Sequence, residues 1–218
     1  MPNPYLIVAF LHVALAVLGA LDASLIHLDL LPIHGGLRWM RVHFITLGAL
    51  TEIVFGVFPL LVAARTGIPR PKIRWDIWLT LNLGLLILMI GIPPAHGVFI
   101  TTGGVLVFIA ATLLLRQLWK MRPAQSALRH SDGSKFYMMG IAYLLLGIIV
   151  GTGLWQGWSV WLQIKTPLEV HIHANNWGFM SLVFAGLLVD LYPAFAGRPL
   201  ASGRKVRTLF WLMTLGAL

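Results

Sequence analysis

The chain consists mainly of long apolar runs separated by short polar loops. The runs cover residues 5–29, 42–64, 75–93, 97–119, 136–162, 170–192 and 206–218. Their apolar positions do not alternate strictly with polar ones, so each run predicts a helix rather than a strand. At a rise of about 1.5 Å per residue, the first six runs reach across about 30 Å of hydrocarbon, whereas the seventh is too short. The pattern predicts an all-α integral membrane protein, a bundle of six or seven transmembrane helices.

Composition agrees with this pattern and excludes several kinds of site. Hydrophobic residues make up 58% of the chain and charged residues 11%, whereas a soluble domain carries about 25% charged residues. The chain has no cysteine, which excludes disulfides, iron–sulfur clusters, thiolate haem ligation and covalent c-type haem attachment. The net charge of +9 lies in the loops, so we assign it to membrane topology and lipid headgroups and expect no nucleic-acid partner.

Lysine and arginine are concentrated on one side of the predicted bundle. The loops rich in these residues are 65–74, 116–135 and 198–207. The opposite loops hold only Arg38, Arg41 and Lys165. Because cytoplasmic loops carry the excess of positive charge, we expect the N-terminus to be cytoplasmic. His43 and His173 then lie at the outer ends of two spans that both run inward, at the same depth.

A short pattern recurs along the chain at an interval of 130 residues. His43, Gly48 and Gly56 are matched by His173, Gly178 and Gly186. The preceding runs carry small residues in comparable places, around Gly19 and Gly151. We predict a four-helix unit over residues 1–122, a cytoplasmic loop over 123–135 and a second, incomplete unit over 136–218. The alternative is that the 22 glycines of the chain only reflect ordinary packing of helices in a membrane.

His43 and His173 are the centre of the predicted functional site. Two parallel helices that present one imidazole each at one depth can hold a b-type haem edge-on between them, because neutral imidazole is a good axial ligand for iron. Arg38 and Arg41, just outside the membrane, are suited to pair with haem propionates. The alternative is that each histidine hydrogen-bonds to the backbone or to water at the interface.

The remaining histidines are weaker candidates. His171 lies two residues before His173, so the two side chains face opposite sides of one helix. It either binds a second haem or a metal, or it hydrogen-bonds a loop at the membrane surface. Four others are candidates for a second site, although each alone is more typical of a structural role: His12, His27, His34 and His96. His130 lies in a charged loop, where we expect it to be solvated.

Acidic residues within the predicted spans are few. Asp22 and Glu52 fall near the middle of the membrane, and Asp190 lies near the end of a run. Carboxyl groups in this setting mark proton paths or pair internally. Glu52 follows His43 by nine residues, which places it on the opposite face of an α-helix, so we do not expect it to be a ligand. It either serves a proton route or packs as a protonated, hydrogen-bonded group.

The sequence around His171 also resembles a known family. The His-x-His pattern at 171–173, the glycine five residues after the second histidine and the aromatic–proline end at Tyr192 and Pro193 are similar to the tenth helix of subunit I of the haem–copper oxidase and nitric oxide reductase superfamily. In that family the tenth helix ligates two haems, and the low-spin haem has a second histidine ligand at the outer end of the second helix. The resemblance implies that His43 and His173 bind a low-spin haem b, with His171 as the counterpart of the ligand to the active-site haem. It covers mainly the second and sixth runs, and the family's His-Pro-Glu-Val motif is absent.

These observations lead to one expected function and two alternatives. We expect a membrane haem b protein that transfers electrons through a bis-histidine iron, as a subunit of a respiratory or oxidative complex. Other membrane subunits or an electron-donor protein are the expected partners, together with the lipid bilayer. The first alternative is an enzyme similar to a nitric oxide or oxygen reductase, with a second haem or metal site at His171. The second is a cofactor-free scaffold subunit in which the histidines only pack.

Overall fold

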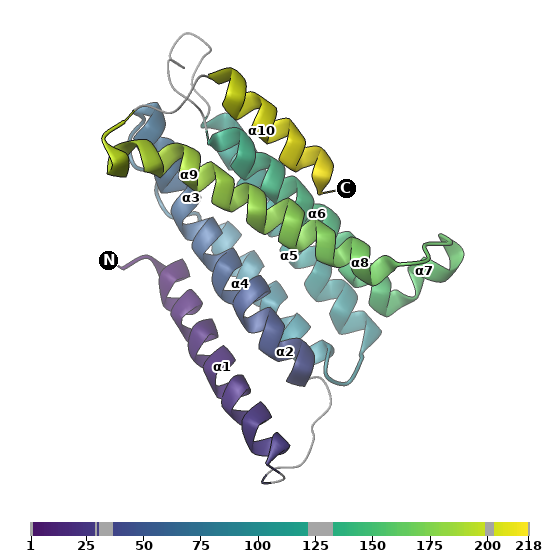
Figure 1. Ribbon diagram of the computed structural model, residues 1–218. Helices are drawn as coiled ribbons and strands as arrows, with labels where there is room; N and C mark the ends of the chain where they lie inside the picture. The colour runs from purple at the N-terminus through teal and green to yellow at the C-terminus, as the bar shows by residue number, and fades with distance from the viewer. Residues whose placement is uncertain (1, 29, 31–36, 122–132, 199–202, 218) are drawn as a thin grey trace. The chain divides into compact units, whose positions relative to one another are not determined.

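The computed structural model describes residues 2–28, 30, 37–121, 133–198 and 203–217 (Figure 1). Within these ranges the chain forms helices joined by turns and contains no strand, which confirms the all-α prediction. The elements of the first half are α1 (Pro4–His27), α2 (Leu37–His43), η1 (Phe44–Leu50), α3 (Thr51–Thr66), α4 (Trp75–Gly91) and α5 (Gly97–Lys120). Those of the second half are α6 (Ser134–Gln156), α7 (Trp158–Trp161), α8 (Pro167–Ile172), η3 (His173–Met180), α9 (Ser181–Ala196) and α10 (Gly203–Gly216).

Among the residues that the structure describes, five helical stretches are long and apolar enough to cross a membrane. They are Pro4–His27, Trp39–Thr66, Gly97–Lys120, Ser134–Gln156 and Pro167–Pro193. Helix α4 is also apolar but shorter. These stretches support the prediction of an integral membrane protein, because each is close to the length that the hydrocarbon core requires. The expected total of six or seven spans stays a prediction.

Local sequence explains where several helices begin and end. Asn3 caps α1, because its side-chain Oδ1 accepts a hydrogen bond from the Tyr5 backbone N–H at 3.1 Å and Pro4 occupies the first helical position. Gly157 caps the C-terminus of α6 and Gly197 that of α9, and both adopt the left-handed conformation that glycine tolerates best.

The chain divides into two compact units. Unit 1 comprises Met1–Leu61 and Arg70–Ala110, and unit 2 comprises Val62–Pro69 and Ala111–Leu218. In unit 1, α1 packs along α2 and η1. In unit 2, α6 packs along α8, η3 and α9, and α10 lies beside both α6 and α9 (Figure 1). The predicted division into 1–122, 123–135 and 136–218 stays a prediction, and most of its loop lies outside the described residues.

Candidate functional site

Two segments of the described chain are π-helical, and both coincide with the predicted haem ligands. His43 is the last residue of α2 and immediately precedes η1, whereas His173 is the first residue of η3. The residue that follows each segment carries a hydroxyl that donates a hydrogen bond to the carbonyl five residues earlier, inside the segment. Thr51 Oγ1 donates to the Thr46 carbonyl at 3.2 Å, and Ser181 Oγ donates to the Asn176 carbonyl at 2.9 Å. Such local widening of an α-helix is frequent at functional sites.

The His43 ring is held in one orientation by its own helix. Its Nδ1 lies 2.8 Å from the backbone oxygen of Trp39, and its ring stacks on the Trp39 indole at a centroid distance of 4.0 Å and an interplanar angle of 12°. A carbonyl oxygen only accepts hydrogen bonds, so Nδ1 carries the proton. The lone pair of the neutral ring is therefore on Nε2, which is the arrangement found in histidines that bind metals.

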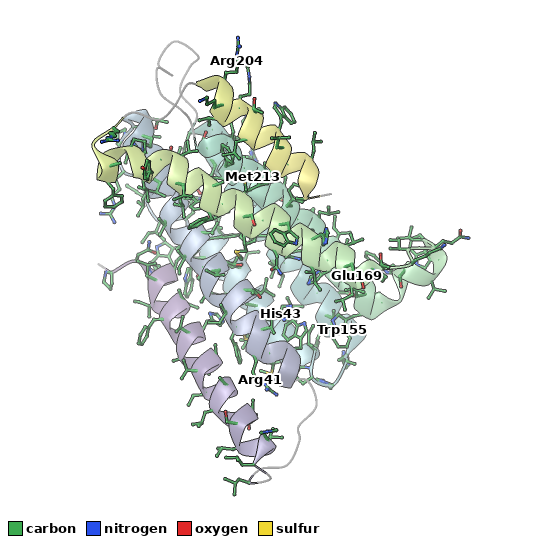
Figure 2. The ribbon with its side chains drawn as sticks, viewed as in Figure 1. Arg41, His43, Trp155, Glu169, Arg204 and Met213 are labelled. Atoms are coloured by element: carbon green, nitrogen blue, oxygen red, sulfur yellow. The ribbon has the colours of Figure 1, made fainter. Side chains whose placement is uncertain are left out.

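The two arginines predicted to bind propionates, Arg38 and Arg41, both lie on the short helix α2. Arg41 lies on α2, two residues before His43 (Figure 2), so the two side chains leave different sides of the helix. Its aliphatic stem lies on α1, because a Cβ added at Gly19 would approach Arg41 Cγ to 2.8 Å. Arg38 also belongs to α2, but its side chain lies outside the described residues. The side chain of Arg41 is thus positioned by packing against α1 rather than by its charge alone.

His171 packs inside unit 2, against α6. Its Nδ1 lies 3.0 Å from the Gly147 carbonyl oxygen, and a Cβ added at Gly151 would approach its Cε1 to 2.8 Å. The Asn175 Nδ2 lies 3.3 Å from the same Nδ1, but it donates to the His171 carbonyl at 2.8 Å. Because Nδ1 must donate to the Gly147 carbonyl, it cannot also accept from Asn175. We therefore assign the proton of His171 to Nδ1.

His173 has a different environment from His171. Its side chain is exposed, as are those of Asn176 and Trp177, which follow it in η3. His171 therefore faces α6, while His173 lies on the exposed face of the same helical stretch. His43 belongs to unit 1 and His173 to unit 2, so their pairing at one iron stays a prediction.

The other histidines are scattered over the described chain. His27 ends α1 and is exposed, and the exposed ring of His96 lies 4.5 Å from the Phe99 ring. His12 is buried in α1. His34 and His130 lie outside the described residues. Within the described ranges, the structure brings no three His, Asp or Glu side chains together as a metal-binding group.

Contacts around the glycines recur in both units. In unit 1, a Cβ added at Gly48 would meet the ring of His12 at 2.6 Å, and one added at Gly56 would meet Tyr5 Cβ at 2.6 Å. In unit 2, a Cβ at Gly178 would overlap the ring of Tyr143, and one at Gly186 would meet the ring of Tyr137 at 2.6 Å. In both units, glycines on the histidine-bearing stretch therefore let a ring from the preceding long helix lie directly on the backbone.

The buried acids differ in their hydrogen bonding. Asp190 in α9 accepts from the Gly133 backbone N–H at 3.1 Å and from the Tyr137 hydroxyl at 2.8 Å. Glu52 in α3 is fully buried, and neither of its carboxyl oxygens has a hydrogen-bond partner among the described residues. Both alternatives for Glu52, a proton route and a protonated, hydrogen-bonded packing group, stay predictions. The Asp22 Oδ2 atom is likewise buried without such a partner.

Several residues of the site were not anticipated from the sequence. Trp39 orients His43, and Asn175 and Gly147 contact His171. Trp39 and Asn175 each lie four residues from a candidate histidine, which is the spacing of neighbours on a helix face. That spacing is the sequence signal that could have identified them.

Comparisons with models of known protein families, with curated proteins and with solved structures find no match to this chain.

Proposed function

We propose that this chain is a membrane haem b protein in which His43 and His173 ligate one iron and which transfers electrons within a respiratory or oxidative complex. The observation that carries the proposal is that each predicted ligand stands at the start of a π-helical segment of its own unit. Interruptions of this kind are frequent at functional sites because they re-aim side chains. A haem bound by two imidazoles supplies a one-electron carrier without an open coordination position.

The chemistry of the donor set fits this group. His43 donates its Nδ1 proton to the Trp39 carbonyl, so the nitrogen that remains for iron is Nε2. A hydrogen bond of this kind fixes the tautomer and raises the basicity of the ligating nitrogen. The Trp39 ring also restricts rotation of the imidazole by stacking on it. His173 is exposed on η3, which leaves its ring accessible to a cofactor outside unit 2.

Positive charge near the site supports a cofactor that carries carboxylates. Arg41 lies two residues before His43 and leaves a different side of α2, so only its guanidinium, at the end of a long side chain, is proposed to pair with a propionate. The proposal includes an N-terminus on the cytoplasmic side and a haem near the outer face, on the basis of the distribution of lysine and arginine in the loops.

The proposal also includes a shared repeat behind the two units. Its support is the recurrence of three features about 130 residues apart: the histidine at the π-helical segment, the Ser/Thr hydrogen bond within it, and the rings packed on glycines. From the sequence pattern we also propose that the chain is a smaller relative, with about six or seven spans, of subunit I of the haem–copper oxidase and nitric oxide reductase superfamily.

The direct experiment is an optical spectrum of the protein purified from haem-replete cells. We expect a low-spin b-type spectrum that is lost in His43→Ala and in His173→Ala. His96→Ala is the matched control, because His96 is exposed in the hairpin between α4 and α5. Exogenous imidazole should restore the spectrum in His43→Gly, which separates loss of a ligand from loss of the fold. A wild-type protein without haem absorption would contradict the proposal.

A further inference from the structure

Three protonatable side chains line the buried face between α1 and the η1–α3 stretch of unit 1. They are Tyr5, His12 and Glu52, with exposed fractions of 5%, 5% and 0%. Gly48, Glu52 and Gly56 follow one another at four-residue spacing, which keeps them near one helix face. His12 packs on Gly48 and Tyr5 packs on Gly56. Glu52 therefore lies between these two contacts, in the interior of the unit.

The polar atoms at the centre of this face lack partners. Both carboxyl oxygens of Glu52 and the Nδ1 atom of His12 are buried, and none of these atoms has a hydrogen-bond partner among the described residues. The Asn82 side chain of α4 interacts with Glu52 without forming a well-aligned hydrogen bond to either carboxyl oxygen, and its Nδ2 donates to the Trp78 carbonyl at 2.9 Å. A carboxylate without partners is costly to bury in a membrane protein. Glu52 is therefore expected to carry a proton.

The corresponding face of unit 2 has different chemistry. There the rings that lie on the glycines belong to Tyr137 and Tyr143, and both hydroxyls donate hydrogen bonds, to Asp190 and to the Thr214 carbonyl. The position 130 residues after Glu52 is Leu182, which is fully buried. An apolar side chain therefore packs well at this position in unit 2, so packing alone does not explain why unit 1 has a carboxyl group there.

The Tyr5 end of the line leads to the surface. The Tyr5 hydroxyl lies 3.5 Å from the Arg74 backbone oxygen, just before α4. Arg74 and Asp76 form an exposed ion pair there, with Arg74 Nε donating to Asp76 Oδ1 at 2.8 Å. The hydrogen bond to Asp76 raises the pKa of Arg74 above its usual value. The Tyr5 hydroxyl interacts electrostatically with Glu52 as well as with this ion pair. Since Tyr5 packs on Gly56, one helical turn after Glu52, its hydroxyl lies on the side of the buried carboxyl that leads to this exposed ion pair.

We propose that Glu52 is a proton-binding site inside the membrane, and that it exchanges its proton with the aqueous phase through the Tyr5 hydroxyl. In the uptake step, the Tyr5 hydroxyl passes its proton to the Glu52 carboxylate through one intervening water, because no direct hydrogen bond joins the two groups. The Tyr5 oxygen then regains a proton from a hydronium ion of the aqueous phase beside Arg74 and Asp76. No electron moves, so the site stands independently of the haem.

Infrared spectroscopy of the full-length protein in lipid vesicles tests this assignment. In H₂O we expect a protonated-carboxyl band that disappears in Glu52→Gln. The matched control is Asp190→Asn, which should leave this band in place, because Asp190 accepts two hydrogen bonds and is expected to be ionised. The absence of a band assignable to Glu52 would show that the group is ionised and would overturn the proposal.

Deuterium exchange then tests the route. We expect the Glu52 band to shift on transfer to D₂O, and Tyr5→Phe to slow this shift by about 100-fold, the lower end of what a positioned proton-transfer group contributes. The band of Tyr5→Phe in H₂O verifies that the site is intact in that variant. A Glu52 band that never shifts would identify a sealed packing group, and an unchanged rate in Tyr5→Phe would overturn the route through Tyr5.

Discussion

Two helix interfaces pack in the same way but differ in their polar groups: the α1–α3 interface of unit 1 and the α6–α9 interface of unit 2. In both, glycines on one helix receive aromatic or imidazole rings from the other. In unit 2 the tyrosine hydroxyls and the Asp190 carboxyl satisfy one another or the backbone. In unit 1 the Glu52 carboxyl and His12 Nδ1 have no partner within the described residues.

This difference separates the close glycine packing that holds the helices together from the unpartnered polar groups found in unit 1. Close approach at glycine is common to both interfaces and depends on shape. Among the described residues of these two interfaces, the unpartnered buried polar groups lie at the one in unit 1. They destabilise it, since each loses its hydrogen bonds to water without replacement. A group retained at such a cost is a candidate for function, whereas the satisfied network around Asp190 is explained by stability.

The largest effect is expected where a glycine is replaced. Gly178→Ala should destabilise the protein by about 3 kcal/mol, because its Cβ would overlap the Tyr143 ring and the backbone must shift. Unfolding in mixed micelles of increasing denaturing-detergent fraction measures this. Gly203→Ala is the matched control, since a Cβ at Gly203 meets open space. Equal stabilities for the two variants would contradict close packing at Gly178.

Removing the acid of the satisfied network should have the next largest effect. Asp190→Ala leaves the Gly133 N–H and the Tyr137 hydroxyl without this acceptor, and should cost about 2 kcal/mol. The same unfolding assay applies. Combining this change with Tyr137→Phe should cost less than the sum of the two single changes, because the second removes one of the unsatisfied donors. Strict additivity would argue against the hydrogen bond.

Glu52→Leu is expected to change stability in the opposite direction. It places in unit 1 the residue type that unit 2 has at the matching position, and it should stabilise the protein by about 1 kcal/mol, because an unpartnered buried carboxyl is replaced by an apolar side chain. A loss of stability would indicate that Glu52 has a partner, and the two interfaces would then not differ in the way described.

The smallest effect concerns the π-helical segments. Thr51→Val removes the hydroxyl that binds the Thr46 carbonyl, and Ser181→Ala removes the corresponding bond to Asn176. Each should cost about 0.5 kcal/mol of stability. If the segments orient haem ligands, both changes should also shift the spectrum of the bound haem. An unchanged haem spectrum in both variants would show that the π-helical segments do not orient the haem ligands.

The sequence predicted the helices well because each apolar run has a length and a boundary that chemistry dictates. Asn3 and Pro4 begin α1, and Gly157 and Gly197 end α6 and α9. The π-helical segments could not be predicted, because a shift of the backbone hydrogen bonds by one residue leaves no mark on the apolar pattern. The expectation that Glu52 lies opposite His43 assumed α-helical rotation throughout, but η1 intervenes and turns through less angle per residue.

The candidate site could be predicted only in part, for a related reason. His43 and His173 stand out by their spacing, and Trp39 and Asn175 could have been suspected from theirs. The partners of Asp190 could not, because Gly133 and Tyr137 lie more than fifty residues away along the chain. Whether an acid is satisfied depends on such distant groups, so Asp190 and Glu52 could not be told apart before the helices were packed.

The most direct test of the central claim is near-infrared magnetic circular dichroism of the oxidised protein, since this spectrum identifies the two axial ligands of a low-spin haem. We expect one haem per chain with the charge-transfer band of bis-imidazole ligation, absent from His43→Ala and His173→Ala and unchanged in His171→Ala. A haem with any other ligand pair, or a bis-imidazole signal that survives the loss of His43 or His173, would contradict the account.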